Sequence, residues 1–162
     1  MPNVSSYSAK LKTPFAVLGI RTAAGAVTGL AYLPASERAM APANAVAERA
    51  CRQLERYLAD PQFRFTVPLA PEDTEFRRRV WAALSTIPVG ESRTYGEMAR
   101  QLATAARAVG GACGANPIAL VIPCHRVVGS QGALGGFMGA TAGDPIAIKR
   151  WLLAHEGYRF GH

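Results

Sequence analysis

Apolar positions in the first half of the chain change from a strand-like to a helix-like pattern. Two β-rich runs, residues 15–22 and 26–33, are separated by Ala23-Ala24-Gly25, which is typical of a hairpin turn. A helix is expected next, because apolar residues recur there at spacings of three and four. This stripe comprises Val46, Ala50, Cys51, Leu54, Tyr57 and Leu58. Cys51 is therefore expected to be a small core residue rather than a reactive one.

A connecting segment follows this helix. Residues 59–71 contain three prolines and show little periodicity, although one short strand is expected near residues 63–67. We place a domain boundary near Pro71, so that the chain divides into an N-terminal domain, residues 1–71, and a C-terminal domain, residues 72–162.

Two short helices joined by a tight turn are expected within the C-terminal domain. Thr94 and Glu97 have the spacing of a capping box, so a helix should begin there and run to about Leu102. After a turn at Ala103, Thr104 is a candidate N-cap for a second helix over residues 105–113. This arrangement describes a helix-turn-helix. It is preceded by a helix that begins at Asp73 or Thr74 as cap and ends before Pro88, with an apolar face at Phe76, Val80, Ala83, Leu84 and Ile87.

The second of these short helices consists almost entirely of small residues. Arg107 is its single long cation, and Gly110 and Gly111 each weaken a helix by roughly 1 kcal/mol relative to Ala. Two interpretations remain open. The helix is either packed tightly inside the protein, or its backbone approaches a groove closely while Arg107 projects from it.

The last predicted helix begins at Asp144-Pro145 and ends before Gly157. Its expected apolar stripe comprises Ile148, Trp151, Leu152 and His155. Glu156 then lies at the C-terminal end, where a negative charge opposes the helix dipole. It is either an exposed glutamate or a carboxylate that orients His125.

The net charge of +7, with 18 Lys and Arg against 11 Asp and Glu, favours an anionic partner such as nucleic acid. Fifteen of the cations are Arg, the side chain suited to phosphate and base edges. The longest early apolar run, residues 15–20, is far short of the roughly 20 residues that span a bilayer. With no signal peptide visible, we expect an intracellular protein, cytoplasmic or nuclear. Cys51, Cys113 and Cys124 are too few for a secreted disulfide framework.

The candidate chemistry lies in the apolar run 121–128, which contains Cys124 followed by His125. A thiol is a nucleophile only as thiolate, and His125 is a candidate base, directly or through a water. Asn116 precedes Pro117 and is a candidate bridge from the loop of Cys124 to the preceding helix, or only a turn residue. A nucleophilic role requires the Cys124 sulfur to be ionised and exposed.

Four blocks of sequence resemble the O6-alkylguanine-DNA alkyltransferases, also called methylated-DNA-protein-cysteine methyltransferases. The blocks are Arg107-Ala108-Val109-Gly110-Gly111, Asn116-Pro117, Pro123-Cys124-His125-Arg126-Val127-Val128 and Leu152-Leu153-Ala154-His155-Glu156-Gly157. The resemblance is dense over residues 76–157 and looser over residues 14–33.

The resemblance implies an α/β (α+β) protein. Its N-terminal α/β domain is expected to be RNase H-like and structural, and its C-terminal domain mostly helical, with a winged-helix or helix-turn-helix element. The implied function is direct-reversal DNA repair by a single-turnover suicide enzyme, which moves the alkyl group of a flipped-out O6-alkylguanine irreversibly to Cys124. O4-alkylthymine is a second candidate substrate. We expect a monomer acting on double-stranded DNA, with no cofactor, no membrane and no obligate protein partner. No metal is expected, because residues 1–71 contain one cysteine and no histidine.

Site roles follow from the same resemblance. Cys124 is the acceptor, His125 the water-mediated base, Glu156 its orienting carboxylate and Asn116 a hinge. Arg107 corresponds to a finger that fills the space left by the flipped nucleotide, and Tyr95 to a tyrosine that promotes base rotation. The implied DNA-contacting set is Thr94, Tyr95, Arg107, Ala108, Gly110 and Ser130. The implied base pocket is Tyr95, Val127, Leu134, Gly135, Phe137, Met138 and Gly139.

Two departures from the family and three alternatives stay open. Met138 stands where members of the family commonly have Ser or another small or polar residue, and the segment 139–145 is several residues longer than in many of them. Both differences leave the range of accepted alkyl groups open. The first alternative is a non-catalytic alkyltransferase-like lesion-binding protein, which would lack the reactive cysteine. The second is a Cys-His hydrolase, which would need an oxyanion hole and would turn over repeatedly. The third is a helix-turn-helix regulator in which Cys124 is dispensable.

Overall fold

The chain divides into two compact units. The computed structural model describes residues 7–71, 73–130, 133–135 and 144–160. The first unit comprises Met1–Glu72 and Pro117–Val121, and the second Asp73–Asn116 and Ile122–His162. Residues Pro117–Val121, which we expected to belong to the C-terminal domain, are thus part of the first unit. The class is mixed α/β, and no helix within the described ranges has the length and hydropathy needed to span a bilayer.

The first unit contains a three-stranded antiparallel sheet in the order β1-β2-β3. The strands are β1 (Ala9–Lys12), β2 (Val17–Ala23) and β3 (Ala26–Leu33). The predicted hairpin is confirmed, and its turn places Ala24 and Gly25 at φ values of 50° and 77°. β1 was not predicted: Ala9 and Leu11 alternate with lysines as in a half-buried strand, but the run is only 4 residues long.

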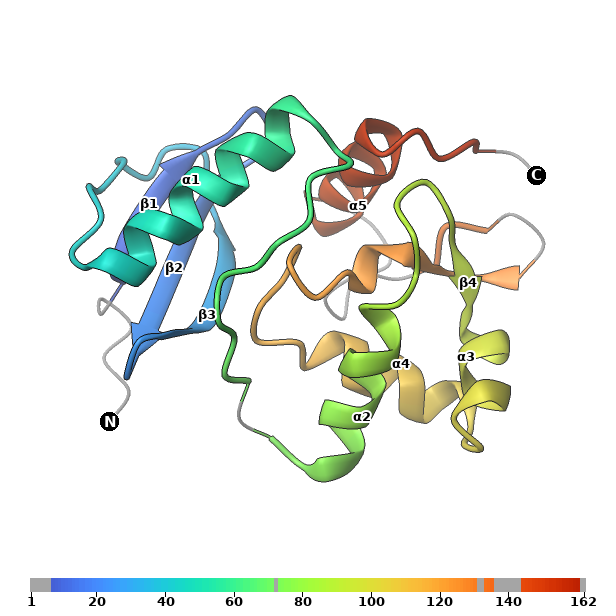
Figure 1. Cartoon of the computed structure of the whole chain (residues 1–162). Coiled ribbons are helices and arrows are strands. Elements are labelled where there is room, and N and C mark those ends of the chain that lie inside the picture. Colours follow the sequence, from blue (N-terminus) through green and yellow to red (C-terminus); the bar gives the residue numbers. More distant parts are fainter. Residues whose placement is uncertain (1–6, 72, 131–132, 136–143, 161–162) are drawn as a thin grey trace. The chain divides into compact units, whose positions relative to one another are not determined.

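Helix α1 (Ala45–Ala59) lies against this sheet (Figure 1). It begins where the Asn44 side chain accepts a hydrogen bond from the amide of Ala47 at 2.9 Å. Cys51 lies on its buried side, as predicted. The strand expected near residues 63–67 is wrong. The amides of Thr66 and Val67 donate to the side-chain oxygen of Gln53 instead of to a neighbouring strand.

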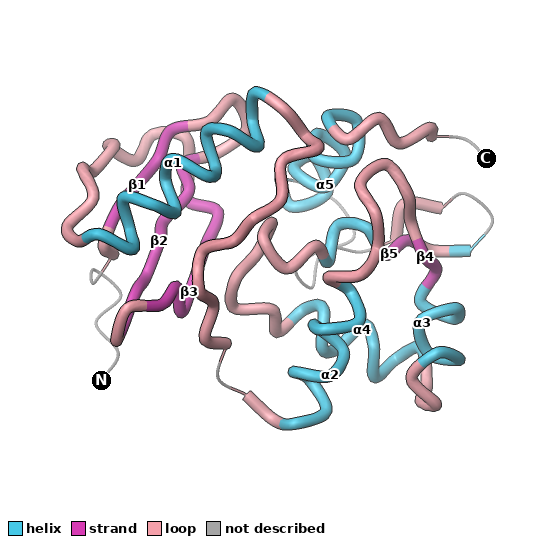
Figure 2. Tube along the Cα trace, in the orientation of Figure 1, coloured by secondary structure: helices cyan, strands magenta, loops and turns pink. Residues whose placement is uncertain are grey.

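The second unit is mostly helical (Figure 2). It contains α2 (Glu75–Leu84), β4 (Arg93–Thr94), α3 (Tyr95–Gln101), α4 (Ala106–Gly114), the 3₁₀ helix η1 (Cys124–Arg126), β5 (Val127–Val128) and α5 (Asp144–His155). β4 and β5 pair in parallel, so that Arg93 lies opposite Val127. This pairing brings the start of α3 beside the strand that follows Cys124.

Helix starts agree with the sequence in two cases and differ in one. Thr74 caps α2, which settles the choice between Asp73 and Thr74. The capping box at α3 is confirmed, with Thr94 N to Glu97 Oε1 at 2.7 Å and the reciprocal bond at 3.0 Å. The prediction that Thr104 caps the next helix is wrong, because α4 starts one residue later and Ala105 takes the cap position without a side-chain bond.

Helix α5 is rotated relative to its predicted stripe. Ile148 and Leu152 are buried as expected, but Trp151 and His155 are only partly buried and stack on each other at 4.9 Å. The remaining buried residues are Lys149 and Leu153, both 0% exposed. The helix ends as predicted before Gly157, whose φ is 84°.

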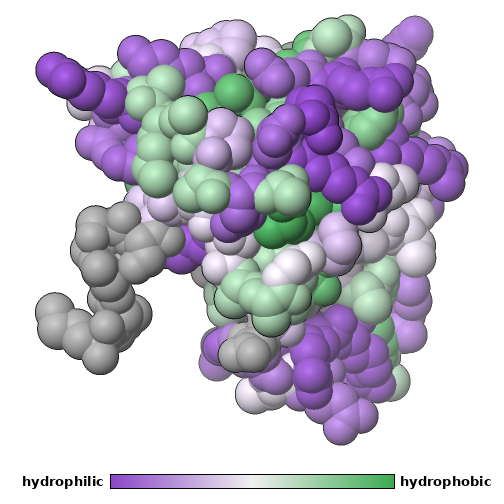
Figure 3. All heavy atoms as spheres, turned by 60° about the vertical axis from the view of Figure 1, so that its left-hand side comes forward, coloured by the Kyte–Doolittle hydropathy of each residue, from purple (hydrophilic) through white to green (hydrophobic). Residues whose placement is uncertain are grey.

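Hydrophilic side chains dominate the face of the molecule drawn in Figure 3, and apolar residues form smaller areas between them. In the described part of the chain, the exposed large apolar residues are Met40, Leu69 and Phe160, each 36–39% exposed. A surface of this kind, on a chain with net charge +7, suits a charged partner better than an apolar one.

Candidate active site

The backbone before Cys124 is held in a tight turn. Cys124 N donates to Ile122 O at 2.8 Å across Pro123, whose φ of −83° and ψ of 63° are those of an inverse γ-turn. Pro123 restricts φ and contributes no N–H group, and η1 begins directly after it. The local sequence therefore sets where the thiol lies.

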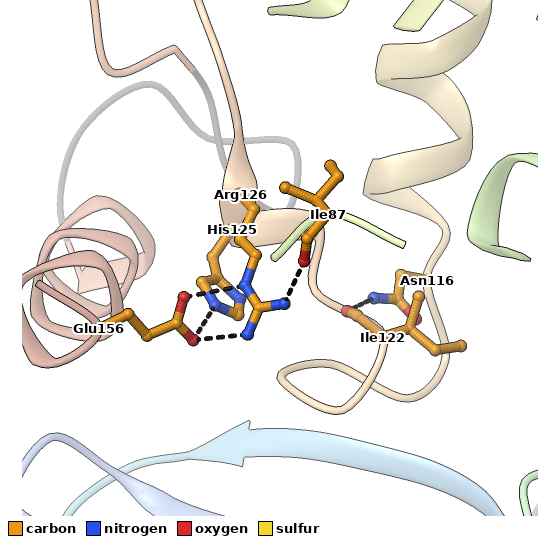
Figure 4. A network of polar contacts seen from close by, with 6 residues as sticks. All are labelled: Ile87, Asn116, Ile122, His125, Arg126 and Glu156. Atoms are coloured by element: carbon orange, nitrogen blue, oxygen red, sulfur yellow. Dashed lines mark hydrogen bonds and ion pairs between the residues drawn. The ribbon is translucent and has the colours of Figure 1, made fainter. Parts of the chain in front are cut away.

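Asn116 ties this turn to the segment after α4. Its Nδ2 donates to Ile122 O at 2.9 Å (Figure 4) and to the Cys124 sulfur at 3.1 Å. Asn116 therefore bridges the loop of Cys124 to the segment after α4 and is not only a turn residue. An amide N–H on sulfur also stabilises a thiolate more than a thiol.

His125, Arg126 and Glu156 form a buried network. Figure 4 shows the two side chains of η1 pointing toward the carboxylate that follows α5. His125 Nε2 lies 2.8 Å from Glu156 Oε2, and Arg126 donates from Nε to Oε1 at 2.9 Å. Arg126 Nη1 also donates to Ile87 O at 2.7 Å. Glu156 is only 4% exposed, so the interpretation as an exposed terminal glutamate is wrong.

The electrostatics of this network assign a tautomer to His125. Burial alone would raise the pKa of Glu156, but the hydrogen bond from His125, and the hydrogen bonds and charge of Arg126, lower it to about 2. Burial lowers the pKa of His125, against the opposing effect of Glu156. A neutral imidazole therefore donates from Nε2 to an ionised carboxylate. Nδ1 then holds the lone pair, and it has no hydrogen-bond partner within the described part of the chain.

The Cys124 side chain is buried, whereas we expected it to be exposed and ionised. The residue is 4% exposed, and burial, followed by the effect of the Cys113 thiol, raises its pKa well above the ordinary value. The bond from Asn116 and the charge of Lys149 act in the opposite direction. The sulfur therefore lies among polar groups rather than sealed in hydrocarbon.

Lys149 is a site residue that the sequence analysis missed. It is 0% exposed, and its Nζ donates to Val127 O at 2.7 Å and lies 5.9 Å from the centre of the Tyr95 ring. Burial lowers its pKa to about 8, while the nearby thiols Cys113 and Cys124 oppose that change. The available signal was its spacing of three and four residues from Leu152 and Leu153.

Tyr95 lies beside the same cluster. Burial, and then the two thiols, raise the pKa of its hydroxyl to about 12, so it remains protonated. A side chain at Gly135 would lie 3.1 Å from its ring, so that glycine permits a close approach. Val127 is buried and Leu134 partly exposed. The predicted pocket residues Phe137, Met138 and Gly139, and residues 140–143, lie outside the described residues.

The surface of α4 argues against the tightly packed internal helix. Val109 and Ala112 are buried, but Arg107 and Gly111 are exposed. Apart from adjacent residues and the backbone of α4 itself, a Cβ added at Gly110 or Gly111 would meet no atom within 4 Å. The glycines are therefore not required by packing inside the chain. Of the other predicted DNA contacts, Ser130 is exposed and Thr94 and Ala108 are partly exposed.

No cluster in the described part of the chain brings together three His, Cys, Asp or Glu side chains that could hold a metal ion.

The sequence model of a known family matches residues 75–158: "6-O-methylguanine DNA methyltransferase, DNA binding domain". The chain is 50% identical over 110 residues to a methylated-DNA–protein-cysteine methyltransferase of Methanosarcina acetivorans, covering 67% of either chain. It is also 50% identical over 95 residues to the protein of that name from Shigella flexneri, covering 57% of this chain and 53% of that one. The matched part thus spans one half to two thirds of these relatives.

A solved structure is similar over nearly the whole chain. Mycobacterium tuberculosis OGT in complex with DNA is 39% identical, with a TM-score of 0.78, and the match covers 91% of each chain. The similarity therefore extends into both units of the chain.

Proposed function

Because the chain belongs to the 6-O-methylguanine DNA methyltransferase family, we propose that it repairs DNA by moving the alkyl group of O6-alkylguanine irreversibly to Cys124. The observation that carries this proposal is the arrangement around the thiol. Asn116 and Lys149 favour its ionised form, and a neutral His125 held by Glu156 has a lone pair available on Nδ1.

In the proposed reaction, His125 Nδ1 receives the proton of Cys124 directly or through a water. Glu156 stabilises the resulting imidazolium and fixes the ring. The thiolate attacks the alkyl carbon, the bond from that carbon to O6 breaks, and the electron pair stays with guanine. A protonated Tyr95 is suited to donate a hydrogen bond to the departing purine. A thioether has no hydrolysable bond, so each molecule reacts once.

The substrate must leave the duplex stack before it reaches a buried thiol. Extrusion of a base costs a few kcal/mol, and least for a poorly paired one. We assign α3 and α4 to a helix-turn-helix within a winged-helix unit, and Arg107 to the space that the base vacates. Thr94, Tyr95, Ala108, Gly110 and Ser130 complete the proposed DNA contacts. The proposed base pocket comprises Tyr95, Val127, Leu134, Gly135 and residues 137–139.

The proposal extends to the remaining expectations. We assign residues 72–162 to DNA binding and alkyl transfer, and residues 1–71 to a structural domain of RNase H-like topology. The protein acts as an intracellular monomer on double-stranded DNA.

Intact-mass analysis tests the reaction. After incubation with duplex DNA that contains O6-methylguanine, the natural protein should gain one methyl group and Cys124→Ala none. An undamaged duplex is the control. Labelling of both proteins, or repeated turnover as in a hydrolase, would overturn the mechanism. Tight binding to the lesion without a mass change would favour the non-catalytic lesion-binding alternative.

Substitution of Arg107 tests the assignment of α4. Arg107→Ala should slow repair of a duplex more than transfer from free O6-benzylguanine, because only the duplex requires extrusion. Arg100→Ala, an exposed arginine of α3, is the matched control. Equal losses on both substrates would contradict the finger role.

A further inference from the structure

A groove of about 600 Å³ in the second unit adjoins the proposed DNA contacts and extends beyond them. Three segments form it: residues 90–94, which end in β4, residues 128–129 at the end of β5, and residues 157–159, which follow α5. Its volume lies within the range of ligand-binding sites, roughly 300–1,000 Å³. The proposed alkyl transfer takes place at Cys124 and does not require such a hollow.

Two arginines supply the positive charge of this groove. Arg93 is partly exposed, and its Nη1 donates to Ser92 O at 2.9 Å and to Glu91 Oε1 at 3.3 Å. Arg159 is exposed and has no hydrogen bond or ion pair to any described residue. Glu91 is the one acidic residue among those that line the groove, so the lining carries one net positive charge.

The ion pair between Arg93 and Glu91 leaves Arg93 available to a ligand. The two side chains are 37% and 55% exposed, and exposed pairs of this kind contribute little to stability. Within the described ranges, Nε and Nη2 of Arg93 make no hydrogen bond. A phosphate can accept two parallel hydrogen bonds from a guanidinium, which makes it a stronger partner than this carboxylate.

The walls of the groove are held in place by contacts within the second unit. β4 and β5 pair in parallel (Figure 2), which places Thr94 opposite Val128. Gly90 lies against the end of α5, where a Cβ atom would stand 3.0 Å from Glu156 O, and its φ of 83° favours glycine. The groove is therefore formed before any ligand binds.

We propose that this groove binds the sugar-phosphate backbone of DNA, with Arg93 and Arg159 as its phosphate ligands. It continues directly from two of the proposed DNA contacts, since Thr94 follows Arg93 in β4 and Ser130 follows Gly129. Arginine is suited to phosphate because its planar fork matches the phosphate oxygens. The inference rests on the proposed function, to which it adds a part of the DNA interface.

The groove has a consequence for the extrusion of the damaged base. Phosphate contacts carry no sequence information, but they fix the position of the duplex on the protein. Binding energy from contacts remote from the reacting atoms can offset the cost of unstacking the base. Loss of the groove should therefore slow reaction with a duplex and leave reaction with a free base unchanged.

The salt dependence of binding to an O6-methylguanine duplex tests the charge, with Cys124→Ala present throughout so that no alkyl group is transferred. Each phosphate contact contributes about 0.9 to the slope of log K against log salt concentration. Arg159→Gln should make the slope shallower by about 0.9, and Arg93→Gln with Arg159→Gln by about 1.8. Arg159→Lys keeps the charge and should keep the slope. Arg150→Gln, an exposed cation outside the groove, is the matched control and should keep it too.

Replacement of single phosphates by uncharged methylphosphonates locates the contact. The protein with both arginines should lose affinity at one or two positions where the double variant loses none, since there the partner is already gone. In proteins that retain Cys124, the double variant should react more slowly with the duplex and at the natural rate with free O6-benzylguanine.

An unchanged salt slope in the double variant, or the same methylphosphonate profile with and without the arginines, overturns the inference. Equal losses with the duplex and with free O6-benzylguanine would also overturn it, because the arginines would then act through the folding of the second unit. Groove-dependent binding in a protein that never accepts a methyl group would refute the proposed reaction and leave the DNA contact standing.

Discussion

Lys149 shows how one buried charge sets the properties of several neighbours. Its ammonium group is held by Val127 O at 2.7 Å and lies over the Tyr95 ring. It favours the thiolate forms of both Cys113 and Cys124. Burial of a lysine is costly, and here it places a positive charge beside a thiol that burial would otherwise keep protonated.

Lys149→Met, which preserves length but removes the charge, should raise the pKa of Cys124. Its reaction with iodoacetamide at neutral pH should slow by about tenfold, which corresponds to one pKa unit. The rate is measured against pH on the peptide that contains Cys124. Arg150→Met, an exposed cation on the same helix, should leave the profile unchanged. A profile that is identical in the natural protein and Lys149→Met would show that Lys149 acts only in packing.

At the scale of elements, helix α4 lacks features that usually stabilise a helix, and its surface carries few large side chains. Its N-cap, Ala105, makes no side-chain bond, and two of its central residues are glycines surrounded by open space. The neighbouring helix α3, by contrast, has a complete capping box. Internal packing does not require these glycines, and the proposed close approach of the α4 backbone to DNA would account for them.

Gly110→Ala and Gly111→Ala should therefore have opposite effects on folding and on DNA binding. Each should raise the free energy of unfolding by about 1 kcal/mol, because alanine favours the helix. Each should also weaken binding to duplex DNA, measured by fluorescence anisotropy, because a methyl group then stands at the contact surface. Transfer from free O6-benzylguanine should stay the same. Unchanged duplex binding in both variants would remove α4 from the DNA interface.

At the scale of the whole molecule, the carboxylate of Glu156 connects segments that are distant in sequence. From the end of α5, it accepts hydrogen bonds from His125 and Arg126 of η1. Arg126 also donates a hydrogen bond to Ile87 O, in the segment after α2. Because the pKa of Glu156 is lower in the folded chain, the folded state binds fewer protons in acid than the unfolded state. This contribution to stability is complete above the ordinary pKa of 4.5 and is lost as the pH falls toward about 2.

Glu156→Gln should lower the free energy of unfolding at neutral pH by about 3 kcal/mol, since it leaves Arg126 without its buried anion. The variant should also lose less stability than the natural protein between pH 4.5 and about 2. Urea titrations across this range measure both effects. Glu37→Gln is the control, because its ion pair with Lys10 is partly exposed. Parallel pH curves for the natural protein and Glu156→Gln would contradict this account.

Local patterns in the sequence were sufficient to predict several elements of the fold. The hairpin turn at Ala24-Gly25, the stripe of α1 and the capping box of α3 depend on residues close together in the chain, so they are readable from spacing. The approach of Asn116 to the Cys124 loop was also indicated, because a few intervening residues limit the distance. The dense block around Cys124 identified the family.

Tertiary structure decided what depends on groups far apart in sequence. The burial of Lys149 followed from the rotation of α5, which its own periodicity did not fix. The burial of the Cys124 thiol, contrary to expectation, also depends on residues that are distant in sequence. A side chain's solvent and charge environment is a sum over neighbours from the whole unit, and sequence spacing determines only those within a few residues.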